Sequence, residues 1–294
     1  FNGTLSGDLD RKIKNFAGMK IWHVNDYFWN EPGSIINQKL LNYGIDYLMG
    51  YSSHDKHCSY FQKTFPRYLG KVIPVAFGFS ARCEEQSAFE ERKNKAIALG
   101  SVNPLRPLQY ALHNYRESAD FFPDETWFHK FRRMLVLNKE SLSDALDSML
   151  PEFPQIKDFS YDIVAKFNEY RMFVTCESLF LFPSAKAYEG PACGSVQICA
   201  DHPCNHEFGF RDGVNAIMYP LFDVAAMAER IRYYQNHPEQ LQKIKHAGTA
   251  FVKRNYSHQA VAARIARQVE AAWSGQDFRG PEVLQLAAPE VVLS

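Results

Sequence analysis

Residues 182–198 read FPSAKAYEGPACGSVQI, and they predict a loop, a short helix and a buried strand in succession. We expect Pro183 and Ser184 to begin the helix, whose free backbone N–H groups and partial positive charge suit a phosphate group. Lys186 lies in the first turn and adds a full charge. Glu189 follows on the same side of the helix, where its carboxylate can accept two hydrogen bonds from the diol of a ribose. This stretch therefore predicts a diphosphate at the head of one helix and a ribose at its flank.

The same spacing also has a purely structural interpretation. A lysine and a glutamate three residues apart form surface ion pairs on many helices, and an isolated K-x-x-E pattern is more often such a pair. Gly194 ends the helix and lets it pack closely against the strand that follows at Val196. The surrounding sequence has to separate the two interpretations.

Short apolar strands alternate with helical segments on both sides of this stretch. Strands that are apolar on both faces and alternate with helices indicate parallel sheets covered on both sides. The expected strands are 20–24, 44–50, 71–76, 95–101, 134–137, 171–176, 196–200 and 215–219. The expected helices outside the opening stretch are 38–43, 52–65, 104–115, 224–236, 238–254 and 258–273. The fold class is therefore α/β.

Composition restricts the class of protein further. The chain has 294 residues, which suits two modest α/β domains. Its 33 basic and 33 acidic side chains balance, which gives no support to an extended nucleic-acid-binding surface. Six scattered cysteines predict free, buried thiols in a reducing compartment. No apolar run approaches the roughly 20 residues that span a bilayer, and no signal peptide is visible.

A polar run at residues 80–95 separates two halves of the chain. We expect a partial first domain at 1–79, a linker at 80–95, a second domain at 96–273 and a C-terminal tail at 274–294. Only about 80 residues precede the linker, fewer than a mononucleotide-binding half usually needs, so either N-terminal strands are absent from this sequence or the first domain is a shortened variant. The start at Phe1 indicates a processed or trimmed end. The tail either crosses back to the first domain or docks on a partner.

The run KAYEGPACGSVQI at residues 186–198 resembles the K-x-[FY]-E-x-x-A-C-G-x-P-[VI] signature of the group 1 glycosyltransferases. It is most similar to the branch of spore-maturation-type glycosyltransferases. Further stretches resemble family elements in the same order, and the resemblance covers residues 70–270. These stretches are 72–78, 98–106, 208–216, 223–229, 237–248 and 256–257. The resemblance implies the GT-B fold, in which two Rossmann-like domains face a cleft.

The resemblance also implies an activity, the transfer of a sugar from a nucleoside diphosphate sugar to a hydroxyl acceptor. The nucleotide sugar would be the donor substrate, and no metal or other cofactor would be required. Glu189 would bind the ribose of the nucleotide. Lys186 and the backbone at Ser184 and Ala185 would hold the diphosphate.

A second loop would contribute from the facing side of the donor. By resemblance, Ser101 and Arg106 would approach the phosphates, where a cation stabilises the diphosphate as charge develops on it. Arg106 has an equally good interpretation as a solvent-exposed helix residue. The chain also departs from the family pattern at two positions. Leu181 stands where many members carry the first of two glutamates, and Val196 stands where the signature has proline.

Two candidate catalytic residues follow the first predicted strand. His23 and Asp26 lie at its carboxyl end, where functional residues of open α/β sheets gather. Either side chain could deprotonate the acceptor hydroxyl if the reaction inverts the sugar configuration. A hydrogen-bonded structural histidine and a turn aspartate are the alternative interpretation.

The stretch CADHPCNHE at residues 199–207 gathers cysteine and histidine side chains. Such residues bind zinc when their spacing allows a tetrahedral site. Cys199 falls within a predicted strand, and the spacing matches no common zinc pattern. We therefore expect a loop without metal, and by resemblance this loop faces the cleft.

Two further functions fit the same fold. One is a catalytically inactive scaffold or binding subunit that pairs with an active partner, and the other is a sugar-nucleotide epimerase. The expected partners are a nucleotide-sugar donor and a hydroxyl acceptor, which is a glycan, a lipid-linked glycan or a protein. No nucleic acid is expected, and a protein partner is a further option. We expect a cytoplasmic protein, either free or beside a membrane assembly.

Overall fold

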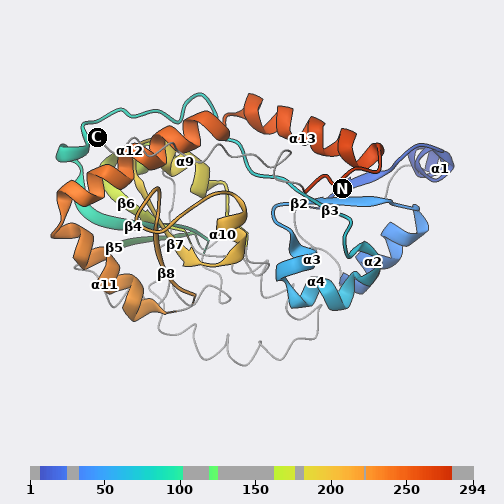
Figure 1. Cartoon of the computed structure of the whole chain (residues 1–294), viewed down its shortest axis with the longest axis horizontal. Helices are drawn as coiled ribbons and strands as arrows, with labels where there is room; N and C mark the ends of the chain where they lie inside the picture. The colour runs from blue at the N-terminus through green and yellow to red at the C-terminus, as the bar shows by residue number, and fades with distance from the viewer. Residues whose placement is uncertain are drawn as a thin grey trace.

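Two parallel β-sheets organise the part of the chain that the computed structural model describes, namely residues 7–24, 33–101, 119–124, 162–175, 182–221 and 223–279. The first sheet has the strand order β1-β2-β3, and the second has the order β5-β4-β6-β7-β8. The sheets lie side by side along the long axis of the molecule, each with its own helices (Figure 1).

The first sheet is small. Its strands are β1 (Ile21–His23), β2 (Tyr47–Gly50) and β3 (Val72–Pro74), and neighbouring strands run parallel. Its helical segments are α2 (Gly33–Asn42), α3 (His54–His57), α4 (Ser59–Thr64) and the 3₁₀ turn η1 (Pro66–Tyr68). Leu48 and Val72 from the sheet pack with Phe61 and Phe65 in one buried cluster. The core of this half therefore lies between the sheet and α4.

The second sheet consists of five parallel strands. They are β4 (Lys93–Ser101), β5 (Ala119–Asp124), β6 (Tyr170–Val174), β7 (Val196–Asp201) and β8 (Ile217–Pro220). From β4 the chain moves to one side to form β5, and it then crosses to the other side to form β6, β7 and β8. The direction of winding therefore reverses between β4 and β6, and open α/β sheets bind ligands beyond the carboxyl ends of their strands at such a point.

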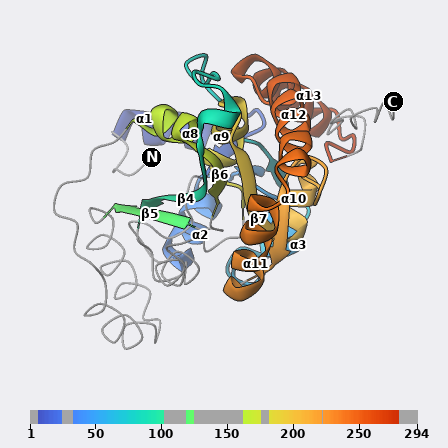
Figure 2. The same cartoon turned by 90° about the vertical axis from the view of Figure 1, so that its left-hand side faces the viewer.

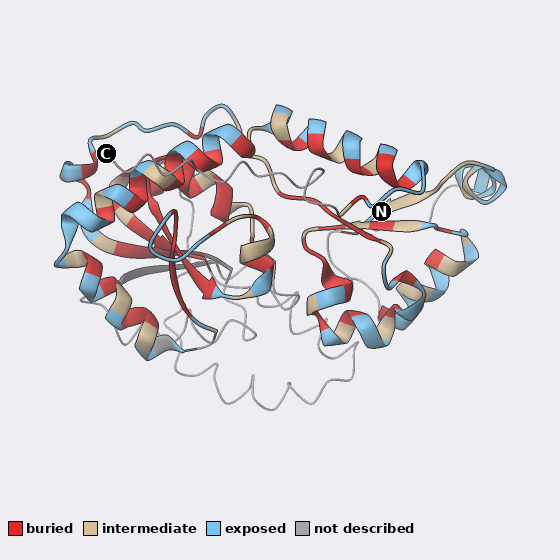
Figure 3. Ribbon diagram, in the orientation of Figure 1, coloured by how far each residue is buried: buried red, intermediate tan, exposed pale blue. Residues whose placement is uncertain are grey.

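Helices cover both faces of the second sheet, as Figure 2 shows from the side. One buried cluster joins Ile97 and Phe173 to α8 (Ile163–Glu169), α9 (Lys186–Ala192) and the end of α12 (Pro238–Asn255). The cluster on the other face joins Ala98 and Val174 to α11 (Val224–Gln235) and the start of α12. Figure 3 shows buried strands between helices that are exposed on their outer sides. This layering explains why the strands are apolar on both faces.

The last helix, α13 (His258–Trp273), returns to the first sheet (Figure 1). Gln268 Nε2 donates a 2.9 Å hydrogen bond to the carbonyl oxygen of Pro74, at the end of β3. Beyond the helix, Phe278 packs in a buried cluster with Ile73, and Arg279 Nη2 lies 2.9 Å from the carboxylate of Asp55. Of the two alternatives for the tail, its described part crosses back to the first sheet.

Most of the expected elements that lie in the described part of the chain form within a few residues of their predicted ends. Two expectations were wrong or incomplete, and three elements, among them β5 and α8, were not predicted. The helix predicted at 52–65 is two helices, α3 and α4, because Cys58 between them has extended backbone angles. The loop expected at 199–207 contains the end of β7 and a short helix, α10 (Pro203–Glu207). Helix α1 (Gly7–Asn15) was not predicted, since it buries no residue and carries surface ion pairs such as Asp8 with Lys12.

Some expectations concern residues outside the described part of the chain. These are the helix at 104–115, the strand at 134–137, Asp26, Arg106 and Leu181. Five cysteines are described, and all five are free and buried, as predicted for those positions. None of the helices that the structure describes combines the length and the apolar character needed to cross a membrane.

Candidate nucleotide-sugar site

Helix α9 lies where the topology predicts a ligand. It follows β6, one of the two strands at which the winding of the second sheet reverses. Its N-terminal end comes from the loop at the carboxyl end of that strand, the edge at which open α/β sheets bind ligands. The sheet thus brings the KAYEGPACG run to the predicted edge.

The first turn of α9 leaves backbone donors available. The N–H of Ala187 donates to the carbonyl of Ser184 at 2.9 Å, and the N–H of Tyr188 donates to the carbonyl of Ala185 at 3.0 Å. The regular helix therefore begins at Lys186, two residues later than predicted. Among the described residues, the N–H groups of Ser184 and Ala185 have no acceptor. Two unpaired N–H groups at a helix head can bind an anion.

The other end of α9 is fixed by a glycine, as expected. Gly194 has a φ of 76°, and its N–H donates to Pro191 while the N–H of Ser195 donates to Gly190. These two bonds form a Schellman motif, which requires a left-handed residue. A Cβ atom on Gly190 would lie 2.3 Å from the ring of Phe173 on β6. The two glycines therefore hold α9 tightly against the sheet.

Glu189 occupies an unusual environment for a carboxylate. The residue is half-buried, and its carboxylate forms no hydrogen bond or ion pair with any residue that the structure describes. Burial raises the pKa of Glu189 above its ordinary value of 4.5, while the charges of Lys186, Arg82 and His258 act in the opposite direction. An ionisable group with a perturbed pKa and convergent charges is a candidate for a functional site.

Sequence reasoning missed two of these cationic residues. Arg82 belongs to the expected linker, and His258 is the first residue of α13. The fold brings them together because Phe79 pairs with Ser257 in an isolated β-bridge. A Cβ atom on Gly78 would lie 2.5 Å from the ring of His258, so glycine permits this close approach. No local pattern in the sequence signals this convergence of three distant segments.

Ser101 is placed by its backbone alone. It is the last residue of β4, which pairs with β6 on one side through Ala98 and Val174. Its backbone therefore lies at the carboxyl edge of the sheet, next to the strand that leads to α9. Its predicted role, like that of Arg106, stays a prediction.

His23 ends β1 in the first sheet, and its side chain is exposed. Its ring packs edge-on against Tyr51, with 5.3 Å between the ring centroids. Tyr51 stacks on Phe77 at 3.8 Å and contacts Phe182 at 5.5 Å. Partial desolvation lowers the pKa of His23 below its ordinary value of 6.5. Aromatic rings thus connect this candidate base to Phe182, two residues before Ser184.

The cysteine and histidine side chains of 199–207 serve structural roles. The side chain of His202 accepts a hydrogen bond from the N–H of Cys204 at the head of α10, and His206 Nε2 lies 2.5 Å from Asp201. Cys199 and Cys204 are buried. Within the described ranges, no group of three or more His, Cys, Asp or Glu side chains is placed to hold a metal ion.

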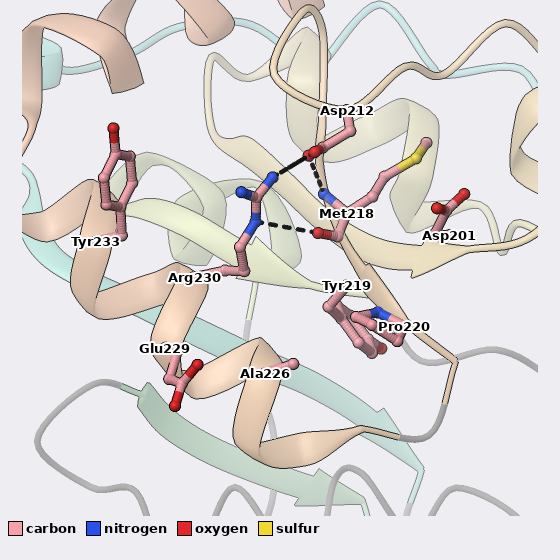
Figure 4. Close-up of a pocket in the computed structure, with 9 residues that line it drawn as sticks. All are labelled: Asp201, Asp212, Met218, Tyr219, Pro220, Ala226, Glu229, Arg230 and Tyr233. Atoms are coloured by element: carbon pink, nitrogen blue, oxygen red, sulfur yellow. Dashed lines mark hydrogen bonds and ion pairs between the residues drawn. The ribbon is translucent and has the colours of Figure 1, made fainter.

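A separate hollow of about 550 Å³ lies at the outer side of β8, against α11 (Figure 4). Arg230 pairs there with Asp212 and donates to the carbonyl of Met218, as the dashed lines mark. The hollow also has two further carboxylates in its lining, those of Asp201 and Glu229, and β8 is two strands away from β6. An acidic hollow whose one lining cation is already paired is poorly suited to a diphosphate. The head of α9, with its unpaired N–H groups and Lys186, is therefore better suited to an anionic ligand than this hollow is.

This arrangement defines a class of protein: two parallel α/β units facing each other, joined by a returning C-terminal helix, are the GT-B fold. Three solved structures share it. HepE of Anabaena, determined with UDP and glucose, has a TM-score of 0.58 at 13% identity, covering 85% of this chain and 71% of that chain. A glycosyltransferase of Rickettsia africae has a TM-score of 0.55 at 13% identity, covering 86% and 70%. Sucrose-phosphate synthase of Thermosynechococcus elongatus has a TM-score of 0.53 at 10% identity, covering 79% and 59%.

A family match agrees with the fold. Residues 157–267 match the family described as "Glycosyl transferase-like". The resemblance to the group 1 glycosyltransferases is thereby confirmed. The closer assignment to the spore-maturation branch stays a prediction. A comparison with curated protein sequences gives no significant match.

Proposed function

We propose that this protein transfers a sugar from a nucleoside diphosphate sugar to a hydroxyl acceptor. The observation that carries the proposal is the half-buried carboxylate of Glu189, which has no partner among the described residues and lies beside Lys186 and the head of α9. A ribose diol would supply the hydrogen bonds that this carboxylate lacks. The structure of HepE contains UDP and glucose, and this likeness of fold supports the choice of donor.

The remaining roles follow from the position of each group. The N–H groups of Ser184 and Ala185, with the ammonium of Lys186, would bind the diphosphate and stabilise the charge that develops as the sugar leaves. Arg82 and His258 would add positive charge near Glu189. These groups would offset the diphosphate charge without a metal ion. The free, buried cysteines agree with the reducing, cytoplasmic setting that we expect.

The first test is the thermal stability of the protein with a panel of nucleoside diphosphates. A ligand that binds the folded state must raise its apparent stability. We expect one nucleoside diphosphate to raise the melting temperature, and the corresponding sugar nucleotides then enter transfer assays with glycan acceptors. Donor binding without turnover would indicate the scaffold function. A product formed from the donor alone would indicate the epimerase.

We expect Lys186→Ala to weaken the binding of the nucleoside diphosphate about tenfold, the effect of losing one charge-assisted hydrogen bond. The same variant should bind the nucleoside without phosphates as the wild type does. Isothermal titration with both ligands separates the two effects. Lys243→Ala on the exposed side of α12 is the matched control. Equal losses for nucleoside and nucleoside diphosphate would contradict the placement of the diphosphate.

If His23 is the base, the pH profile of kcat/KM should report its titration. A base accepts a proton only when neutral, so activity should rise tenfold per pH unit up to a pKa below 6.5 and then level off. His23→Ala should remove this acid limb, and Asp26→Asn tests the other candidate separately. Full activity in both variants would eliminate the proposed base from this pair of residues.

A further inference from the structure

Two short helices face each other where the halves of the protein meet. Helix α3 belongs to the first half and α10 to the second, and they lie next to each other in Figures 1 and 2. At one end, the N–H of Ser53 donates to Glu207 Oε2 at 2.9 Å, and the hydroxyl of Ser53 donates to Glu207 Oε1. At the other end, the rings of His57 and His202 are 6.2 Å apart. The start of each helix therefore meets the end of the other.

Each helix is fixed within its own half. Asn205 in α10 donates to the carbonyl of Ala200 in β7 at 2.8 Å. Asp55 in α3 accepts the N–H of Gly70 at 2.8 Å and pairs with Arg279, and the two side chains of this pair are 3% and 11% exposed. The contact between Ser53 and Glu207 thus joins two helices that are each held in place by their own half, and the two residues are 154 positions apart in the chain.

Helix α3 also contacts the loop that precedes α9. His54 lies edge-on to Phe182, with 5.8 Å between the ring centroids. Two consecutive residues, Ser53 and His54, therefore contact two separate segments of the second half, namely α10 and the loop before α9. Phe182 precedes Ser184, whose N–H group we assign to the diphosphate, by only two residues.

We propose that Ser53 and Glu207 form a clasp that holds the two halves in this arrangement and thereby positions the loop at 182–185 for the donor. In the clasp, the Glu207 carboxylate accepts hydrogen bonds from both the N–H and the hydroxyl of Ser53. Neither residue belongs to one of the hydrophobic clusters. Breaking the clasp should therefore weaken the contact between the two halves, which α13 still links, while each half keeps its core.

The clasp affects donor binding by changing the fraction of the protein that is in the binding-competent arrangement. When only a fraction of the protein is in that arrangement, the apparent Kd for the ligand equals the intrinsic Kd divided by that fraction. We expect Glu207→Gln, which removes the charge and one acceptor oxygen, to raise the KM for the donor about three- to tenfold at nearly unchanged kcat. The effect on KM rests on the proposed function, whereas the effect on the arrangement does not.

Hydrogen exchange on the ligand-free chain tests the clasp without any donor. We expect Ser53→Ala and Glu207→Gln each to increase exchange in both α3 and α10, together with a larger radius of gyration in X-ray scattering. Glu270→Gln, an exposed change on α13, should alter neither quantity. An increase confined to the substituted helix would overturn the clasp, as would an unchanged radius together with unchanged exchange.

A double-mutant cycle on the donor KM then tests the positioning role. Two residues that act only through each other are coupled, so Ser53→Ala with Glu207→Gln should raise KM no more than Glu207→Gln does alone. Independent, multiplying effects would contradict the proposal. If no nucleotide sugar is bound by any form of the protein, the proposed function fails, and the exchange and scattering results still decide the clasp.

Discussion

Glu189→Gln is expected to weaken the binding of the nucleoside diphosphate about 30- to 150-fold while leaving the ligand-free protein as stable as the wild type or more stable. A carboxylate can accept both hydroxyl groups of a ribose, whereas the amide of glutamine offers a single acceptor oxygen. Glutamine loses one of the two hydrogen bonds and makes the other with a neutral oxygen. Together these changes cost about 2 to 3 kcal/mol of binding free energy. The shape of the side chain is kept, so the packing of α9 is not disturbed.

The expected gain in stability follows from the direction of the pKa shift. Burial raises the pKa of Glu189 in the folded protein above the ordinary value of 4.5. Between pH 4.5 and that higher pKa, the folded state holds a proton that the unfolded state has lost, so the free energy of unfolding falls as the pH rises through this window. At neutral pH the ionised carboxylate therefore destabilises the ligand-free protein. A neutral glutamine removes that cost.

Thermal unfolding at pH 7, with and without nucleoside diphosphate, measures both effects. Glu270→Gln on α13 is the control, because its side chain is exposed and the ligand should stabilise this variant as it does the wild type. A lower melting temperature for ligand-free Glu189→Gln, with the ligand-induced rise intact, would show that Glu189 supports the fold and not the ligand. Opposite changes in stability and binding are the signature of a group kept for function.

The local parts of this fold follow from the sequence because local interactions determine them. Helices α11, α12 and α13 form at the expected positions, and α11 and α13 begin at the capping residues Asp223 and Ser257. The strands of the second sheet are apolar on both faces, and helices cover both faces. Lys186 and Glu189 share one side of α9 because they are three residues apart. These patterns repeat within one element, so a single segment reveals them.

The parts that were missed depend on contacts between distant segments. Arg82 and His258 reach Glu189 only after Phe79 pairs with Ser257, and neither residue stands in a recognisable pattern. The break between α3 and α4 falls at Cys58, within a stretch that has no proline or glycine to signal it. The interaction of Ser53 with Glu207 likewise has no local signal. Long-range pairs of this kind are decided by the packing of whole elements.

One buried side chain connects α9 to the segment that precedes the second sheet. Arg92 is 4% exposed, and its guanidinium donates to the carbonyls of Cys193 at 2.9 Å and Ser87 at 2.9 Å. It also donates to the carbonyl of Phe167 and to the side chain of Asn168. Burial lowers the pKa of Arg92, and the carboxylate of Glu85 acts in the opposite direction. The Arg92 guanidinium thus donates hydrogen bonds to three segments: the end of α9, the end of α8 and the chain before β4.

Arg92→Met is therefore expected to lower the free energy of unfolding by about 3 to 4 kcal/mol, because four hydrogen bonds are lost and the carbonyls stay buried. For a domain of this size the apparent melting temperature should fall by roughly 10 °C. Chemical denaturation with circular dichroism measures the change, and Arg267→Met on the exposed side of α13 should change stability by less than about 0.5 kcal/mol. Wild-type stability in Arg92→Met would mean that water or neighbouring groups satisfy these carbonyls. Because Glu189→Gln should leave stability unharmed, the two variants separate the residue that holds α9 in place from the residue on α9 that binds.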